Sequence, residues 1–206
     1  MYRPAGTTPP RPWAPLSDDE WGALRPYVLH RATPGGRQVG DLRARMDAVF
    51  HMACRGYHVP WREVPDVYGK PDTVSRFFRR MTHAGLWHAL LKSLAHPDLW
   101  EGHPLRRIEH YVVRACRRAA RLGGLRLLFL IRELGRTSAL NAPPWLLPDR
   151  RLSEHVWSLP ILPPDLVWGR RGFRGKVRRW LRMLRALHRM AGGRLRIPRS
   201  LRLSWP

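Results

Sequence analysis

The sequence has few acidic residues to balance its arginines. Among 206 residues it has 15 aspartates and glutamates against 38 lysines and arginines, a formal net charge of +23 at pH 7. Only Lys70, Lys92 and Lys176 are lysines, so nearly all of the cations are arginines. This excess of positive charge predicts a polyanionic partner, with nucleic acid first and an anionic membrane surface second. A gene rich in arginine codons would also contribute to it.

Cysteines and long apolar runs are also scarce. The two cysteines, Cys54 and Cys116, are too few for a disulfide framework. The longest apolar run is Leu127–Ile131, which is much shorter than the about 20 residues that a membrane-spanning helix needs. Residues 2–15 lack the apolar core of a signal peptide. We therefore expect a soluble, cytoplasmic protein.

Composition and periodicity predict an all-α fold in three parts. Apolar residues recur at helical spacing along most of the chain, and the positive charge is concentrated after a short polar stretch near residues 98–104. We expect a proline-rich, disordered N-terminus over 1–15, a small helix-turn-helix domain over 16–96, and a basic, partly irregular or disordered extension over 104–206. Within the small domain, the Ser17 to Glu20 spacing is typical of a capping box that starts a helix.

The segment 72–83 has the pattern most relevant to function. It follows a short helical segment at 60–65 and a turn at 66–71, an order typical of helix-turn-helix domains, whose second helix enters the major groove. Four apolar side chains at helical spacing predict its buried face: Val74, Phe77, Phe78 and Met81. Polar side chains on the other faces are the candidate DNA contacts: Thr73, Ser75, Arg76, Arg79, Arg80 and His83.

Other cations are predicted to contact the phosphate backbone, which gives affinity without sequence preference. They lie before the 72–83 helix and on two basic amphipathic helices, over 104–122 and 172–190: Arg62, Lys70, Arg114, Arg118, Arg178 and Arg182. The 172–190 helix also meets the criteria for a helix at a membrane surface. A membrane-surface or general polyanion binder is therefore an alternative, and a tail translated from a shifted reading frame is another.

Five short motifs follow one another in the first half of the chain. They are Leu16–Trp21 (LSDDEW), Asp41–Arg45 (DLRAR), Trp61–Pro65 (WREVP), Thr73–Arg80 (TVSRFFRR) and Ala84–Trp87 (AGLW). Together they resemble the N-terminal domain of bacterial insertion-sequence transposases over about residues 16–95. The resemblance implies a helix-turn-helix domain that binds the terminal inverted repeats of the element. Met81 departs from the family pattern, which tends to have tryptophan at this position.

The resembled transposases also have a catalytic domain, in which two aspartates and a glutamate hold two divalent metal ions. The second half of this chain has no matching pattern among its acidic residues: Glu109, Glu133, Asp149, Glu154 and Asp165. We therefore expect no enzymatic activity, catalytic residue, metal site, cofactor or small-molecule substrate.

The expected partner is double-stranded DNA, such as the inverted repeats of an insertion element, which would place the protein at the nucleoid. A second copy of the chain is a further expected partner. So is a separately encoded catalytic half, as in a transposase split by programmed frameshifting.

Overall fold

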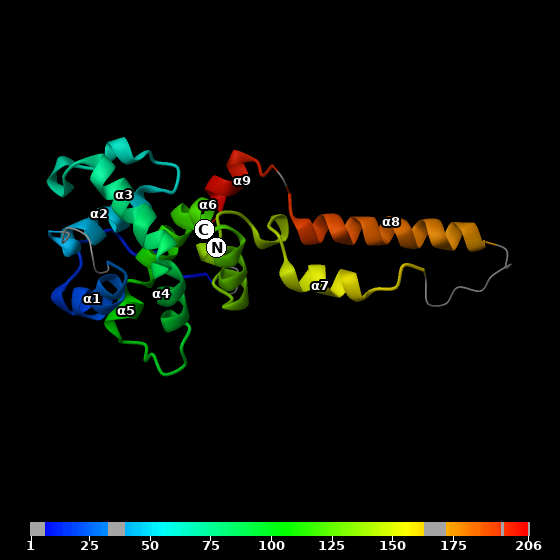
Figure 1. Cartoon of the computed structure of the whole chain (residues 1–206), viewed down its shortest axis with the longest axis horizontal. Coiled ribbons are helices and arrows are strands. Elements are labelled where there is room, and N and C mark those ends of the chain that lie inside the picture. The colour runs from blue at the N-terminus through cyan, green and yellow to red at the C-terminus, as the bar shows by residue number, and fades with distance from the viewer. Residues whose placement is uncertain (1–6, 33–39, 163–171, 195, 206) are drawn as a thin grey trace. The chain divides into compact units, whose positions relative to one another are not determined.

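The computed structural model of the chain describes residues 7–32, 40–162, 172–194 and 196–205. Every regular element in these residues is a helix, and none of them is a β-strand (Figure 1). The prediction of an all-α fold is therefore confirmed. The chain forms two compact units, residues 1–141 and residues 142–205.

The first unit is built around the helical segment Glu109–Glu133, in which non-helical backbone at Gly124 (φ 56°, ψ −154°) separates a longer helical part from a shorter one. Its described helices are α1 (Asp18–Ala32), α2 (Leu42–Arg55), α3 (Pro71–His83), α4 (Leu86–Leu94), α5 (Pro104–Arg107) and α6 (Glu109–Glu133), with 3-10 helices at Trp61–Glu63, Asp66–Tyr68 and Thr137–Ala139. α6 packs against α2, α3 and α4. The compact unit therefore extends beyond the range 16–96 that the sequence predicts for the DNA-binding domain.

Aromatic side chains join α2, α4 and α6 in the core of this unit. The ring of Phe50 on α2 lies 6.4 Å from that of Trp87 on α4 and 5.7 Å from that of Tyr111 on α6, measured between centroids. All three side chains are fully buried. The indole N–H of Trp87 donates to Thr82 Oγ1 at 2.7 Å, so the one polar group of this buried ring has a partner.

The start of α1 follows the capping pattern in its sequence. Ser17 Oγ accepts a hydrogen bond from the backbone N–H of Glu20 at 3.2 Å, and Glu20 Oε2 accepts one from the backbone N–H of Ser17 at 3.0 Å. This reciprocal pair satisfies two of the N–H groups that a helix start leaves without partners. The predicted capping box is therefore confirmed.

Residues 7–15 are held against α6 by hydrogen bonds. Thr8 Oγ1 donates to Glu109 Oε1 at 2.9 Å, and the hydroxyl of Tyr111 donates to the carbonyl of Pro12 at 2.9 Å. Residues 7–15 of the N-terminus that the sequence predicts to be disordered therefore have polar partners on α6 and no regular structure of their own. Residues 1–6 of that predicted range lie outside the described residues.

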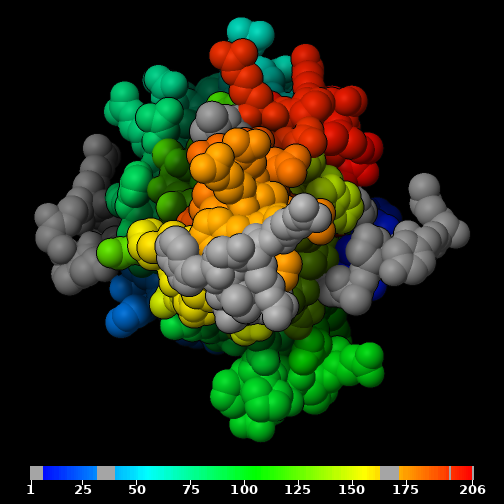
Figure 2. All heavy atoms as spheres, turned by 90° about the vertical axis from the view of Figure 1, so that its right-hand side faces the viewer, coloured from blue at the N-terminus to red at the C-terminus, as the bar shows by residue number. Residues whose placement is uncertain are grey.

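The second unit is built around a pair of helices. Its described elements are a 3-10 helix at Pro144–Leu146, α7 (Arg150–Ser158), α8 (Phe173–Gly192) and α9 (Arg199–Ser204). α7 packs along α8 (Figure 1), and its atoms touch those of α8 in the space-filling view (Figure 2). The backbone N–H of Asp149 donates to the carbonyl of Ala191 at 2.9 Å, which joins one end of the pair. Part of the irregular structure predicted for this half, residues 163–171, lies outside the described residues.

Partly buried histidines make the stability of the first unit depend on pH. Burial, together with the charges of Arg114 and Arg11, lowers the pKa of His110 from its ordinary value of 6.5 to about 4. Burial also lowers the pKa values of His51 and His88. Between pH 6.5 and about 4 the unfolded chain therefore binds more protons than the folded chain. The stabilising contribution is complete above this window and is lost as the pH falls through it.

We expect the variant His110→Gln to show a shallower loss of stability on acidification than the original protein. Because the side chain is only partly buried, the difference in the free energy of unfolding should be about 1–2 kcal/mol across the window. A residual slope should remain, since His51 and His88 still titrate. Urea unfolding at several pH values measures both slopes, and identical slopes would show that His110 stays accessible to protons.

Candidate nucleic-acid interface

α3 is anchored to the first unit by one apolar face. The four side chains that the sequence predicts to be buried are each at most 2 % exposed: Val74, Phe77, Phe78 and Met81. The ring of Phe78 lies 5.6 Å from that of Trp87 on α4 and 5.2 Å from that of Trp61 in the connection before α3. The predicted buried face is therefore confirmed, and these rings fix how α3 is presented.

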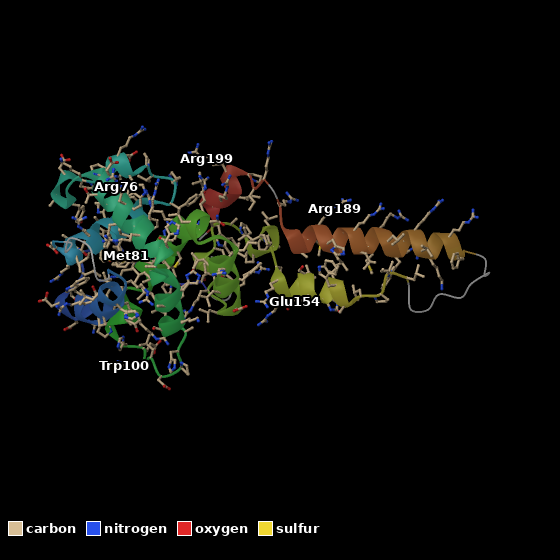
Figure 3. The ribbon with its side chains drawn as sticks, viewed as in Figure 1. Arg76, Met81, Trp100, Glu154, Arg189 and Arg199 are labelled. Carbon is tan, nitrogen blue, oxygen red and sulfur yellow. The ribbon has the colours of Figure 1, made fainter. Side chains whose placement is uncertain are left out.

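The remaining faces of α3 carry the predicted DNA contacts. Ser75 is half-buried, and the other five are exposed: Thr73, Arg76, Arg79, Arg80 and His83. Figure 3 shows Arg76 near the outer edge of the first unit and Met81 among its packed helices. Within the described part of the chain, no ion pair involves Arg76, Arg79 or Arg80. Their guanidinium groups are therefore available to an external anion.

The size and chemistry of this face suit a DNA groove. α3 has 13 residues, so it is about 20 Å long, and with side chains an α-helix is about 10–12 Å wide. The major groove of B-DNA is about 12 Å wide and admits one α-helix. An arginine there can bind the O6 and N7 atoms of guanine with two hydrogen bonds, and hydroxyl side chains can bind phosphates.

The connection between α2 and α3 covers residues 56–70, close to the range that the sequence predicts between these helices. It is longer than the about three or four residues that join the helices of a compact helix-turn-helix. The short helix predicted over 60–65 is a 3-10 helix of three residues, Trp61–Glu63. Arg62 and Lys70, two of the predicted phosphate contacts, are exposed in this connection.

Arg118 on α6 holds this connection in place. Its guanidinium donates hydrogen bonds to the carbonyls of Met52 (3.3 Å), Gly56 (2.9 Å) and Val59 (2.6 Å). It also lies 4.0 Å from the centroid of the Trp61 ring, an attractive cation–π arrangement. Burial lowers the pKa of Arg118 to about 10, so the group remains charged at pH 7. The structure thus gives Arg118 a role inside the unit in place of the phosphate contact that the sequence predicts.

The other predicted phosphate contacts lie on two helices. Arg114 is half-buried on α6, whereas Arg178 and Arg182 are exposed on α8 of the second unit. Three further exposed arginines lie on the same side of α8: Arg174, Arg185 and Arg189. The sequence places Arg185 and Arg189 on the basic face of this helix, and the spacing of four residues from Arg178 is the signal for Arg174.

The residues that the structure describes contain no group of three histidine, cysteine, aspartate or glutamate side chains placed to hold a metal ion. None of the helices there has both the length and the apolar composition needed to cross a membrane.

The fold and this face define an all-α protein that presents a basic helix on a packed helical unit. Residues 16–91 match the sequence profile of a family described as "Putative transposase of IS4/5 family". This part of the chain is therefore similar to the N-terminal region of insertion-sequence transposases, as its motifs predict. The match ends within α4 and includes neither α6 nor the second unit. No curated protein and no solved structure matches the chain significantly.

Proposed function

We propose that this protein is a transposase-derived DNA-binding protein that docks α3 in the major groove of double-stranded DNA. The observation that carries the proposal is the division of α3 into a buried apolar face and an exposed face with Arg76, Arg79 and Arg80. The family match over residues 16–91 supports DNA as the partner. The ends of an insertion element are the DNA that a domain of this kind is expected to recognise.

We further propose that the chain binds DNA without cleaving it. The family match is limited to the N-terminal region, and strand transfer with two metal ions needs a carboxylate cluster from a separate domain. The proposal also includes a protein partner, which is either a second copy of the chain or a separately encoded catalytic half. Incubation of the protein with supercoiled plasmid and Mg²⁺ tests it, and nicked product would overturn it.

A role at a membrane surface has less support. Such a role needs an apolar helix face that is open to the lipid. In the second unit α7 packs along α8, and the apolar side chains Val177, Trp180 and Leu184 are half-buried. The indole N–H of Trp180 also donates to the carbonyl of Pro160 at 2.9 Å. Much of the apolar side of α8 therefore already has a protein partner, although Leu181 on that side is exposed.

Replacement of Arg76 and Arg79 by alanine tests the docking of α3. Each bidentate contact to a base is worth about 1–3 kcal/mol, so the double variant should bind its preferred duplex about 30-fold more weakly or worse. The duplex is first selected from a random-sequence library with the original protein, and affinities are then measured by fluorescence anisotropy. The matched control replaces Arg25 and Arg121, which are exposed in the same unit but not on α3. Equal losses of duplex affinity in the two double variants would show that only net charge matters. That result would refute docking through α3.

A further inference from the structure

α8 carries a row of arginines along one side. The helix has seven cationic residues and no acidic one. Five of them lie within about 80° of arc, at about 100° per residue, and are exposed: Arg174, Arg178, Arg182, Arg185 and Arg189. We call these five the arginine row. Figure 3 shows nitrogen-tipped side chains along the edge of α8 that faces away from α7, with Arg189 among them.

Among the described residues, the arginine row lacks counter-charges. None of its members forms an ion pair in the part of the chain that the structure describes. Glu154, the one acidic residue of α7, is bound to Arg150 at 2.8 Å instead. Like charges three or four residues apart destabilise a helix. The repulsion is relieved when an anionic chain lies along the row, which spans about 22 Å of helix.

An exposed aromatic ring lies next to the arginine row. Trp157 on α7 is 79 % exposed, and its ring meets that of His188 on α8 edge to face, with centroids 6.2 Å apart. His188 follows Arg185, the nearest member of the row, by three residues, which places it about 4.5 Å along α8 and about 60° around it from that arginine. The second unit therefore combines a line of cations with an accessible indole at its side.

We propose that the second unit binds single-stranded nucleic acid, with the arginine row along the phosphates and Trp157 stacked on a base. Single-strand binding proteins combine these two features, a basic track for the backbone and aromatic rings for unpaired bases. Duplex bases are already stacked on each other, so a duplex offers its phosphates to the row but no base to Trp157. The proposal for α3 concerns duplex DNA and the first unit, whereas this one concerns single strands and the second unit. Either proposal can therefore fail without the other.

The arginine row is tested with the full-length protein and fluorescently labelled oligothymidylate, which does not pair with itself. Each phosphate contact to a single strand lowers the slope of log K against log salt by about 0.7, so five contacts predict a slope of about −3.5. The variant Arg178→Gln with Arg182→Gln should make the slope about 1.4 less steep. The matched control, Lys176→Gln with Arg179→Gln, removes two charges from α8 outside the row and should leave the slope nearly unchanged.

The stacking role of Trp157 is tested by Trp157→Ala. Loss of one base–aromatic stack should weaken oligothymidylate binding about 5- to 100-fold. Trp145→Ala is the control, because Trp145 is similarly exposed (70 %) but lies on the 3-10 helix Pro144–Leu146, against Trp205. Trp157→Phe keeps a ring and should recover part of the affinity. Far-UV circular dichroism and urea unfolding establish that each variant folds.

Three results would overturn the proposal. Equal changes of slope in the two α8 double variants would show that the arginines of the row act only through the net charge of the protein. Unchanged affinity in Trp157→Ala would remove the stacking role. Binding to phosphatidylserine vesicles in place of oligothymidylate would assign the surface to membranes. Oligothymidylate binding by the Arg76→Ala, Arg79→Ala protein separates this test from that of α3, because the second unit is unchanged in that protein.

Discussion

A fragment that ends at residue 96 should fail to fold, whereas a fragment of residues 1–141 should unfold cooperatively. The shorter fragment contains all of the family match but lacks α6, which packs against α2, α3 and α4. Five side chains of α6 have no exposed surface: Tyr111, Val112, Ala115, Cys116 and Ala119. Removing α6 also exposes the residues that they cover, including Phe50.

The free energy of folding that is lost with α6 is expected to exceed the total stability of an ordinary domain. Burial of one large apolar side chain contributes about 1.5–3 kcal/mol, and a whole domain is stable by about 5–15 kcal/mol. Loss of several such contributions on both sides of the contact therefore leaves no stable fold. Far-UV circular dichroism and urea unfolding of the two fragments measure this. A cooperative transition in the fragment that ends at residue 96, with the midpoint of the full chain, would contradict it.

Replacement of Arg118 by alanine should destabilise the first unit by about 3 kcal/mol. Hydrogen bonds to charged groups contribute about 1.5–3 kcal/mol each, and Arg118 donates three, to carbonyls before and within the connection that leads to α3. The total is reduced because the Arg118 side chain is only partly buried. Arg118→Lys should recover less than half, because one ammonium cannot reproduce the planar fork of a guanidinium.

The same substitution should also weaken DNA binding at temperatures where the variant is still folded. Arg118 lies on the Trp61 ring, and that ring packs against Phe78 of α3. Loss of the guanidinium therefore loosens the support of α3 without removing any residue that is proposed to touch DNA. Arg121→Ala, an exposed position on the same helix, should change stability by less than about 0.5 kcal/mol. Equal stability of the Arg118 and Arg121 variants would show that the carbonyls find other donors.

Local patterns in the sequence predicted local structure well. The capping box at Ser17 and Glu20 and the buried face of α3 follow from spacing alone, because both depend on residues within one or two helical turns. The exposure of Arg76 and Arg79 follows from the same periodicity. The capping box and α3 also lie within the motifs on which the family resemblance rests. The sequence alone therefore identified α3 as the candidate interface.

Contacts between distant segments were not predictable in this way. Helical periodicity placed Arg118 on the polar side of an amphipathic helix, but it could not show that the carbonyls of Met52, Gly56 and Val59 lie over that side. The anchoring of the N-terminal segment by Tyr111 was missed for the same reason. The jump in charge near residues 98–104 likewise suggested a division of the chain that the packing of α6 does not follow, since charge reflects the surface whereas packing depends on the apolar face.

The place of α6 in the core also limits how the gene can be organised. Because the apolar face of α6 fits α2 and α4, translation as far as residue 141 must proceed in the frame that encodes this face. A ribosomal frameshift that joined this chain to a catalytic half upstream of that point would remove the helix on which the first unit is assembled. Any such junction compatible with a folded first unit therefore lies downstream of the codon for residue 141.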